Sequence, residues 1–423
     1  MTHVLDELGS RGILANTTDL GALRAELSAG PVTYYVGFDP TAPSLHLGNL
    51  VQLVTARRLQ QAGHKPLILV GGATGLIGDP RNSGERTLNS KDVVASWVER
   101  IRAQVQRLID LDGPRGATVV NNLDWTSGLS TIDYLRDIGK HFPVNRMLGR
   151  EVVKARLDSG ISYTEFSYVL LQSLDYLELF RRYGCRLQTG GSDQWGNITA
   201  GVELIRRAEG EHVHALATPL LTKADGTKYG KSETGTLWLD PQMMSPYAFH
   251  QFWLQAEDSQ IGDYLRMFSF RPLEEIDELV RQGVERPSVR IPQRALAADM
   301  TALVHGADEL RAAETAAAAL FGRAELAELD EATLTAALTE APHVRVAAAA
   351  GRLPSVVDGL VSTGLEASKS AARRTVAEGG AYVNNARVDD PDVPLSADSL
   401  LHGRWIVLRK GKRSVAGLEV VSG

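Results

Sequence analysis

Residues 32–49 decide the fold of this chain and read VTYYVGFDPTAPSLHLGN. The apolar run at residues 32–36 predicts a buried strand, which ends as the chain reaches Gly37 and Pro40. Apolar residues then recur at helical spacing, so a helix is expected to begin at Leu47. The chain therefore passes from a buried strand through a short loop into a helix.

The start of that helix is suited to binding phosphate. Gly48 in the first turn has no side chain, so a ligand can approach the backbone closely. The free N–H groups and the dipole of a helix N-terminus attract anions, and the imidazole of His46 can add a donor. A plain helix cap at His46 fits the same sequence, so a purely structural role for this residue stays open.

Composition is typical of a soluble enzyme with two or three domains. The 423 residues are 43% hydrophobic and 23% charged, and no apolar run approaches the ~20 residues of a membrane span. Cys185 is the only cysteine, which excludes an intrachain disulfide and a thiolate metal cluster and fits a cytoplasmic protein. The net charge of -6 argues against indiscriminate nucleic-acid binding, although residues 352–423 carry ten Lys and Arg against eight Asp and Glu.

Alternation of apolar runs with helical patterns predicts an α/β domain. Further buried strands are expected from the apolar runs at residues 66–70, 117–120 and 185–188. Such a domain has a parallel sheet, with ligands at the carboxyl ends of its strands. Glycine-rich loops at residues 71–80 and 189–197 indicate close approach of the backbone to a ligand or to another part of the chain. Residues 1–31 are expected to be a helical lead-in.

The helix expected at residues 165–183 carries a polar stripe on an apolar surface. Tyr168, Gln172 and Asp175 stand at i, i+4 and i+7 and so share one face. Such a stripe either faces water, which is the commoner case, or lines a polar pocket. Asp79 and Asp193, which end the two glycine-rich loops, are candidates to bind an ammonium group and a ribose hydroxyl.

A second motif at residues 228–232, KYGKS, places two ammonium groups on a glycine-containing loop. Together with HLGN at residues 46–49 it resembles the HIGH and KMSKS signatures of the class I aminoacyl-tRNA synthetases, in the same order. Asn49 stands in place of the second His of HIGH, and Tyr229 and Gly230 in place of Met and Ser of KMSKS. Because of these departures, the contribution of each motif residue to catalysis stays open.

The resemblance narrows to the bacterial tyrosyl-tRNA synthetases. It rests on five ordered segments, at residues 35–49, 71–79 with 85–89, 168–175, 190–197 and 228–232. It implies that the chain activates L-tyrosine with ATP, giving tyrosyl-adenylate and pyrophosphate, and transfers tyrosine to the 3′ end of tRNA(Tyr). Mg²⁺ would arrive with ATP and needs no metal-ligating residues of the protein.

The family also implies a domain organisation. Residues 1–245 would form a Rossmann-like catalytic domain and residues 246–322 a small all-α domain that binds the anticodon. Residues 323–351 would be a linker and residues 352–423 an α+β S4-like RNA-binding domain. In the family the region at 136–156 contributes to a dimer interface, which implies a homodimer.

Four groups of site residues follow from the family motifs. The tyrosine-binding residues would be Tyr35, Asp79, Tyr168, Gln172, Asp175 and Gln194. The ATP-binding residues would be Gly37, Asp39, Thr41, His46, Gly48, Asn49, Gly191, Asp193, Lys228, Lys231 and Ser232. The catalytic residues would be Thr41, His46, Asn49, Lys228, Lys231 and Arg86, or Arg81 in place of Arg86. The RNA-binding residues would be Lys369, Arg373, Arg374, Lys410 and Lys412.

Other interpretations remain open. An RNA-binding regulator with a decayed nucleotide site would have the same domains, but the intact His46, Asp79 and Asp175 count against decay. A tryptophan-specific sister enzyme would share the fold, but an indole requires a single acceptor in place of the Tyr35 and Asp175 pair. An enzyme that adenylates tyrosine for another acceptor would not need the RNA-binding tail. By composition alone the basic residues of that tail are more typical of a solvated charged face.

Overall fold

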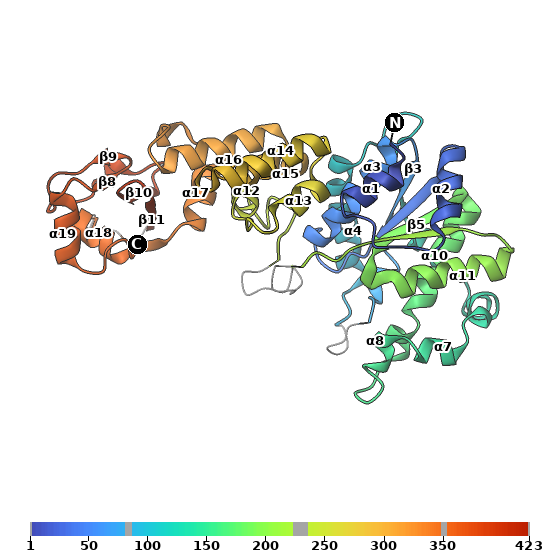
Figure 1. The fold of residues 1–423 in the computed structure, drawn as a ribbon. Helices are drawn as coiled ribbons and strands as arrows, with labels where there is room; N and C mark the ends of the chain where they lie inside the picture. Colours follow the sequence, from blue (N-terminus) through green and yellow to red (C-terminus); the bar gives the residue numbers. More distant parts are fainter. Residues whose placement is uncertain (1, 81–86, 223–235, 348–352, 422–423) are drawn as a thin grey trace. The chain divides into compact units, whose positions relative to one another are not determined.

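A computed structural model describes residues 2–80, 87–222, 236–347 and 353–421. The chain divides into two compact units, each built from two segments of the sequence (Figure 1). The first comprises Met1–Met243 and Glu257–Pro287, and the second comprises Met244–Ala256 and Ser288–Gly423. Within the described residues, no helix combines the length and the apolar character that crossing a membrane requires.

The first unit is built on a six-stranded sheet with the order β1-β6-β5-β2-β3-β4. Its strands are β1 Asn16–Thr17, β2 Thr33–Phe38, β3 Lys65–Val70, β4 Thr118–Asn121, β5 Cys185–Gly191 and β6 His214–Thr218. All neighbours pair in parallel except β1 with β6. The chain moves outward from β2 to β3 and β4 and returns as β5 on the other side of β2. The Rossmann-like parallel sheet is confirmed, and ligands of such sheets bind where the strand order reverses.

The helical lead-in expected at residues 1–31 is present but is interrupted by a short strand. The segment contains α1 Val4–Ser10 and α2 Leu20–Ala29 with β1 between them. The N–H groups of Ala15 and Thr18 donate to carbonyl oxygens of β6, and this pairing holds the short strand in place. A two-residue strand has no periodicity of its own, so the sequence could not reveal it.

Helices α10 Tyr168–Tyr183 and α11 Trp195–Glu209 pack against each other and against β5. Apolar side chains from these helices and from β2 and β3 form one buried cluster, which includes Tyr35, Leu67, Tyr176 and Leu204. The helix expected at residues 165–183 is interrupted, because α9 Tyr163–Phe166 ends at Ser167 and α10 starts after it. The polar stripe therefore occupies the first turns of α10.

The remaining helices of the first unit are α3 Leu47–Gln61, α4 Lys91–Leu108, α5 Leu123–Thr126, α6 Thr131–Asp133, α7 Val144–Leu148, α8 Glu151–Lys154, α13 Ile261–Phe268 and α14 Leu273–Glu285. Two buried arginines tie the end of α13 to α1 and α3. Arg11 and Arg58 both donate to the carbonyl oxygen of Ser269, and both donate to the carboxylate of Glu7. Helices α13 and α14 thus belong to the unit that contains the sheet.

The second unit contains α12 Pro246–Leu254, α15 Ile291–His305, α16 Ala307–Leu320, α17 Glu331–Glu340, α18 Val356–Ser362 and α19 Lys369–Ala377. It also contains a five-stranded sheet with the order β7-β11-β10-β8-β9. The strands are β7 His343–Ala347, β8 Ala381–Val383, β9 Ala386–Arg387, β10 Trp405–Lys410 and β11 Ser414–Val421. Strand β11 follows β10 along the chain and is its antiparallel partner.

The described part of the segment expected as a linker, residues 323–351, carries regular structure. It contains α17 and β7, and β7 pairs in parallel with β11. The indole N–H of Trp405 donates to Thr335 of α17 at 3.0 Å, and Trp405 shares a buried cluster with Leu338. Ala337 of the same segment is buried in this cluster, so the segment contributes to the core of the second unit.

A glycine at the end of α10 gives a test of how this helix is terminated. Gly184 adopts the left-handed conformation with φ of 63°, and a Cβ there would meet open space. Gly184→Ala should lower the free energy of unfolding by about 1 kcal/mol, because an L-residue is strained in this conformation. Chemical denaturation followed by circular dichroism measures the change.

Gly9→Ala is the matched control. Gly9 lies in α1 and also has open space where a Cβ would lie, but its backbone is helical. This variant should be as stable as the native protein or slightly more stable. Equal losses in the two variants would show that the left-handed conformation is not the cause.

Candidate active site

A cavity of about 360 Å³ lies where the strand order reverses, at the carboxyl ends of β2 and β5. Every candidate site residue of the catalytic domain that the structure describes lines it: Tyr35, Gly37, Asp39, Thr41, His46, Gly48, Asn49, Asp79, Tyr168, Gln172, Asp175, Gly191, Asp193 and Gln194. The remaining candidates of that domain lie outside the described residues: Arg81, Arg86, Lys228, Lys231 and Ser232. The polar stripe of α10 thus faces the cavity.

The start of α3 is held by reciprocal side-chain bonds. The Nδ1 atom of His46 accepts a hydrogen bond from the N–H of Gly48 at 3.1 Å, and the Asn49 side chain accepts one from the N–H of His46 at 3.0 Å. His46 is therefore a helix cap and a cavity residue at once. With Nδ1 accepting, the neutral ring carries its proton on Nε2, where it can serve as a donor. Asn49, which stands in place of the second His of the motif, acts as an acceptor in this cap.

Asp175 lies at the buried end of the cavity with a side chain almost fully shielded from solvent. Its two oxygens accept hydrogen bonds from the indole N–H of Trp125 at 2.9 Å and from the amide of Asn122 at 3.0 Å. Burial raises the pKa of Asp175 to about 8, although both donors lower it. The carboxyl group is therefore poised to change its protonation state near neutral pH.

Four buried polar atoms of the cavity have no hydrogen-bond partner among the described residues. They are the hydroxyl of Tyr35 and the side-chain oxygens of Gln52, Gln172 and Gln188. A buried polar atom left without a partner costs about 1–3 kcal/mol. Four of them lining one cavity indicate that a bound molecule with several polar groups completes the site.

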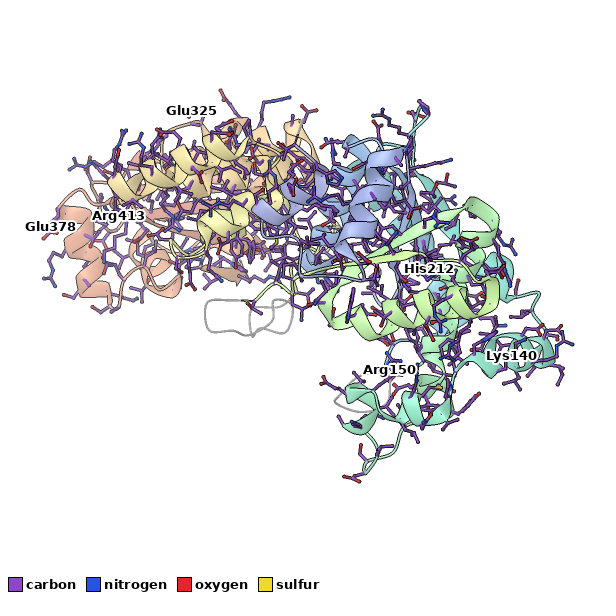
Figure 2. All side chains as sticks on the ribbon, turned by 45° about the vertical axis from the view of Figure 1, so that its right-hand side comes forward. Lys140, Arg150, His212, Glu325, Glu378 and Arg413 are labelled. Atoms are coloured by element: carbon purple, nitrogen blue, oxygen red, sulfur yellow. The ribbon has the colours of Figure 1, made fainter. Side chains whose placement is uncertain are left out.

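Asp79 is held by amides at the other side of the cavity. Its carboxylate accepts hydrogen bonds from Gln194 at 3.0 Å and from Asn197 at 3.1 Å. Arg150, labelled in Figure 2, comes from the segment between α7 and α8 and donates to the side-chain oxygen of Asn197. Of these four residues, Asp79 and Gln194 line the cavity. Asn197 and Arg150 do not line it and hold the other two in position through hydrogen bonds.

Tyr168 and Asp39, predicted to bind different substrates, contact each other. The Tyr168 hydroxyl donates to Asp39 at 2.5 Å, and the Thr74 hydroxyl donates to the other oxygen of Asp39 at 2.6 Å. Burial and the nearby negative charge of Asp39 raise the pKa of Tyr168 well above its usual range. Tyr168 therefore remains protonated and a donor.

The glycine-rich loop after β3 shows what the backbone approaches there. A Cβ on Gly71 would lie 2.2 Å from the hydroxyl oxygen of Thr74 and 2.4 Å from a carboxylate oxygen of Asp39. A Cβ on Gly72 would lie 2.4 Å from the amide oxygen of Asn121. Of the two possibilities left open for this loop, the backbone here approaches other parts of the chain, namely the side chains that form the site.

Several residues of the site escaped the sequence analysis. Asn122 and Trp125 hold Asp175, Thr74 holds Asp39, and Gln188 lines the cavity from β5. Asn122 directly follows β4, so the rule that ligands gather at the carboxyl ends of strands could have identified it. Trp125 has no such signal, because a tryptophan after a strand is more often part of the core.

The basic residues of the second unit are partly neutralised. Lys369 pairs with Asp358 at 2.6 Å, Arg373 with Asp392 at 2.6 Å, and Lys410 with Glu366 at 2.9 Å. Arg374 and Lys412 are exposed. The side chains lie on α19 and at the β10–β11 turn, and Ser368 caps α19 by accepting from the N–H of Ala371.

Comparison with known proteins gives two family matches. Residues 27–322 match the tRNA synthetases class I (W and Y), and residues 334–416 match the Tyrosine–tRNA ligase SYY-like C-terminal domain. The Tyrosine–tRNA ligase of Streptomyces avermitilis is 62% identical over 426 residues, covering 100% of both chains. That of Kineococcus radiotolerans is 62% identical over 421 residues, covering 99% of both chains.

Solved structures of tyrosyl- and tryptophanyl-tRNA synthetases resemble this chain. A C-terminally truncated mitochondrial tyrosyl-tRNA synthetase of Coccidioides posadasii superposes with a TM-score of 0.66 at 30% identity, covering 74% of this chain and 91% of that one. A tryptophanyl-tRNA synthetase of Encephalitozoon cuniculi shares the fold, with a TM-score of 0.53 at 14% identity over 72% of this chain.

The two donors of Asp175 give a pH-dependent test. Trp125→Phe removes one of them and should raise the pKa of Asp175 above 8. The unfolded carboxyl ionises near 3.8, so the folded protein loses stability as pH rises until its own pKa is reached. The variant should therefore continue to lose stability above pH 8, by about 1 kcal/mol more than the native protein. Urea denaturation at pH 7 and pH 9.5 measures the difference.

Trp405→Phe is the matched control, because the Trp405 indole donates to the neutral hydroxyl of Thr335. Its loss of stability should be the same at both pH values. A Trp125→Phe effect that is also independent of pH would show that the indole does not hold an ionising carboxyl group.

Proposed function

The chain belongs to the class I tRNA synthetases for tryptophan and tyrosine, and we propose that it is a tyrosine–tRNA ligase whose active site is the cavity around Asp175. The reaction uses ATP as a substrate together with Mg²⁺. Two steps follow: tyrosine and ATP give tyrosyl-adenylate and pyrophosphate, and the tyrosyl group is then transferred to tRNA. We propose that it acts in the cytoplasm, on tRNA and ATP.

The choice of amino acid rests on one observation. Asp175 and the hydroxyl of Tyr35, which has no hydrogen-bond partner among the described residues, are both buried and line the same cavity. A phenol hydroxyl can donate to the carboxylate and accept from Tyr35 at once. Phenylalanine would leave both groups buried without a partner, which is unfavourable. An indole has a donor and no acceptor, so tryptophan would leave the Tyr35 hydroxyl unsatisfied.

The amino and carboxyl groups of tyrosine would bind at the part of the cavity around Asp79, away from Asp175. Asp79 supplies a carboxylate for the ammonium group, with Tyr168 and the unpartnered oxygen of Gln172 beside it. Gln194, already bonded to Asp79, would lie next to the reacting carboxylate. Tyrosine bound in this way spans the cavity from Asp175 to Asp79.

ATP would occupy the side of the cavity formed by the start of α3. The Nε2 proton of His46 and the positive end of the α3 dipole suit phosphate oxygens, and Gly191 and Asp193 suit the ribose. The other proposed ATP contacts are Gly37, Asp39, Thr41 and Asn49, with Arg86, Lys228, Lys231 and Ser232 from the part of the chain outside the described residues.

Magnesium fits this site as a companion of the nucleotide. No group of three or more metal-binding side chains exists among the described residues, which suits an ion held by phosphates and water. When bound, it neutralises charge on the phosphates.

The chain's own residues would act by position and charge. The tyrosine carboxylate is already a nucleophile at neutral pH, so its attack on the α-phosphorus needs no protein base. Donors at His46 and the start of α3 would stabilise the charge that builds on the phosphate oxygens as pyrophosphate leaves. A terminal ribose hydroxyl of tRNA then attacks the mixed anhydride and releases AMP.

We propose that residues 1–245 carry this chemistry and that tRNA contacts come from residues 246–322 and from the S4-like domain at 352–423. Lys369, Arg373 and Lys410 could exchange their carboxylate partners for RNA phosphates, and Arg374 and Lys412 are already exposed. Such contacts make the binding of tRNA sensitive to salt. Residues 323–351 would join the two RNA-binding parts.

A homodimer is supported by exposed apolar side chains near residues 136–156. Ile132, Val144 and Tyr163 are each more than 60% exposed, and a neighbouring hollow is lined by Phe142 and Met147. A concentration of exposed apolar groups of this kind is typical of an interface.

The test of the function is tyrosine-dependent exchange of pyrophosphate into ATP, followed by charging of a tRNA(Tyr) transcript. Asp175→Ala should abolish the selection of tyrosine over phenylalanine. Tyr35→Phe should lower kcat/KM for tyrosine about 5–10-fold, the equivalent of one neutral hydrogen bond, and should raise that for phenylalanine, because no Tyr35 hydroxyl is then left without a partner.

Each alternative function has its own outcome. Absence of exchange with intact RNA binding would indicate a regulator, and exchange without tRNA charging would indicate a different acceptor. Exchange driven by tryptophan in preference to tyrosine would indicate the sister specificity.

The dimer is tested by sedimentation. The native protein should sediment at twice the mass of the chain, and Val144→Asp should shift it toward the monomer, because a charge would be buried in the interface. Val284→Asp, at an exposed valine of α14, is the matched control and should remain dimeric. A native monomer would contradict the proposal.

A further inference from the structure

A continuous line of hydrogen bonds connects Asp39 to Asp175, and Asp39, Thr74 and Asp175 of this line also line the cavity. The Thr74 hydroxyl donates to Asp39 at 2.6 Å and accepts from the Asn122 amide at 2.9 Å. The same Asn122 amide donates to Asp175 at 3.0 Å. Tyr168 donates to the far oxygen of Asp39 and lies on the same helix as Asp175, so the line closes into a ring through α10.

We propose that Thr74 is a positioning residue that couples the nucleotide side of the cavity to the recognition of the tyrosine hydroxyl. This inference rests on the proposed function and adds a residue that acts on both substrates at once. Thr74 connects Asp39, which would face ATP, through Asn122 to Asp175, which would bind the phenol.

The direction of each bond in the ring is determined. Thr74 has one hydroxyl proton, and it is directed to the carboxylate of Asp39, so the Thr74 oxygen can only accept from Asn122. The two amide protons of Asn122 are both used, one for Thr74 and one for Asp175. The Asn122 oxygen accepts from the N–H of Ala73 at 2.7 Å. No member can turn without breaking a bond to its neighbour, so the two carboxylates constrain each other.

The hydrogen-bonded residues Thr74, Asn122 and Asp175 are also buried. Thr74, Asn122 and Asp175 are each at most 2% exposed, so water cannot readily replace a broken bond. Gly71 permits the contact between Thr74 and Asp39, because a Cβ there would lie 2.2 Å from the Thr74 oxygen. A plain packing residue in the position of Thr74 would need neither the hydroxyl nor the glycine.

The coupling has two consequences for the enzyme. A nucleotide that fixes Asp39 would fix Asn122 and hence the orientation of Asp175. By reciprocity, tyrosine bound at Asp175 would favour the binding of ATP at Asp39 to the same extent. Selection of the amino acid and use of ATP are therefore linked through one hydroxyl group.

The experiment compares Thr74→Val with Thr74→Ser in the full-length protein. Valine keeps the volume and removes the hydroxyl, which leaves a proton of Asn122 buried without a partner. We expect the ratio of kcat/KM for tyrosine to that for phenylalanine to fall about tenfold, and the KM for ATP to rise severalfold. Serine retains the hydroxyl, so both quantities should stay within about twofold of the native values.

Thr301→Val in α15 is the matched control. Thr301 is fully buried, its hydroxyl has no partner among the described residues, and it lies in the second unit. The same exchange there should change neither the substrate ratio nor the KM for ATP. Melting temperatures of all three variants show whether each remains folded.

A structural role alone gives a different result. If Thr74→Val lowers the melting temperature or the rates with both amino acids equally, and the tyrosine to phenylalanine ratio is unchanged, the coupling is wrong. A changed ratio with an unchanged KM for ATP also overturns it, because only the Asn122 side would then depend on Thr74. A native protein without tyrosine-dependent exchange would instead refute the proposed function.

Discussion

A buried carboxyl group needs donors, and the architecture of the site follows from how Asp175 obtains them. Neither donor lies on its own helix: Asn122 and Trp125 both come from the segment after β4. Without them, the carboxyl group at the bottom of a pocket would be protonated over a wider range of pH and would be a weaker acceptor. The placement of α10 against the end of β4 is thus a condition for recognising a hydroxyl group.

The topology of the sheet provides that placement. Reversal of the strand order next to β2 opens a cavity between the loops that follow β2 and β5, and the loop after β3 also lines it. The segment after β4 supports the lining residues Thr74 and Asp175 through hydrogen bonds. Each loop contributes side chains that hold those of the next one, as Thr74 holds Asp39 and Asn122 holds the backbone at Ala73. The loops around the cavity therefore support one another. The protein side chains that would bind the substrate are oriented before the substrate arrives.

The sequence predicted the parts of this site that touch the ligand better than the parts that support them. His46, Asp79 and Asp175 stand at a helix start, a loop end and a helix face, where local rules suffice. Asn122, Trp125 and Thr74 act through contacts between distant segments, which periodicity does not encode. The same reason explains β1, whose two residues are a strand only because β6 lies beside them. The segment before β7 was expected to be a linker, and the small side chains that pack there, such as Ala337, give no conspicuous apolar pattern.

The parallel pairing of β7 with β11 means that the C-terminal module starts earlier in the chain than its basic residues suggest. A fragment excised at residue 352 would lose β7, and the backbone groups of β11 that now pair with it would become an open edge. Open edges of this kind recruit other strands, so the fragment would tend to self-associate or aggregate. The autonomous folding unit at this end of the molecule must therefore include His343–Ala347, and α17 before it covers Trp405.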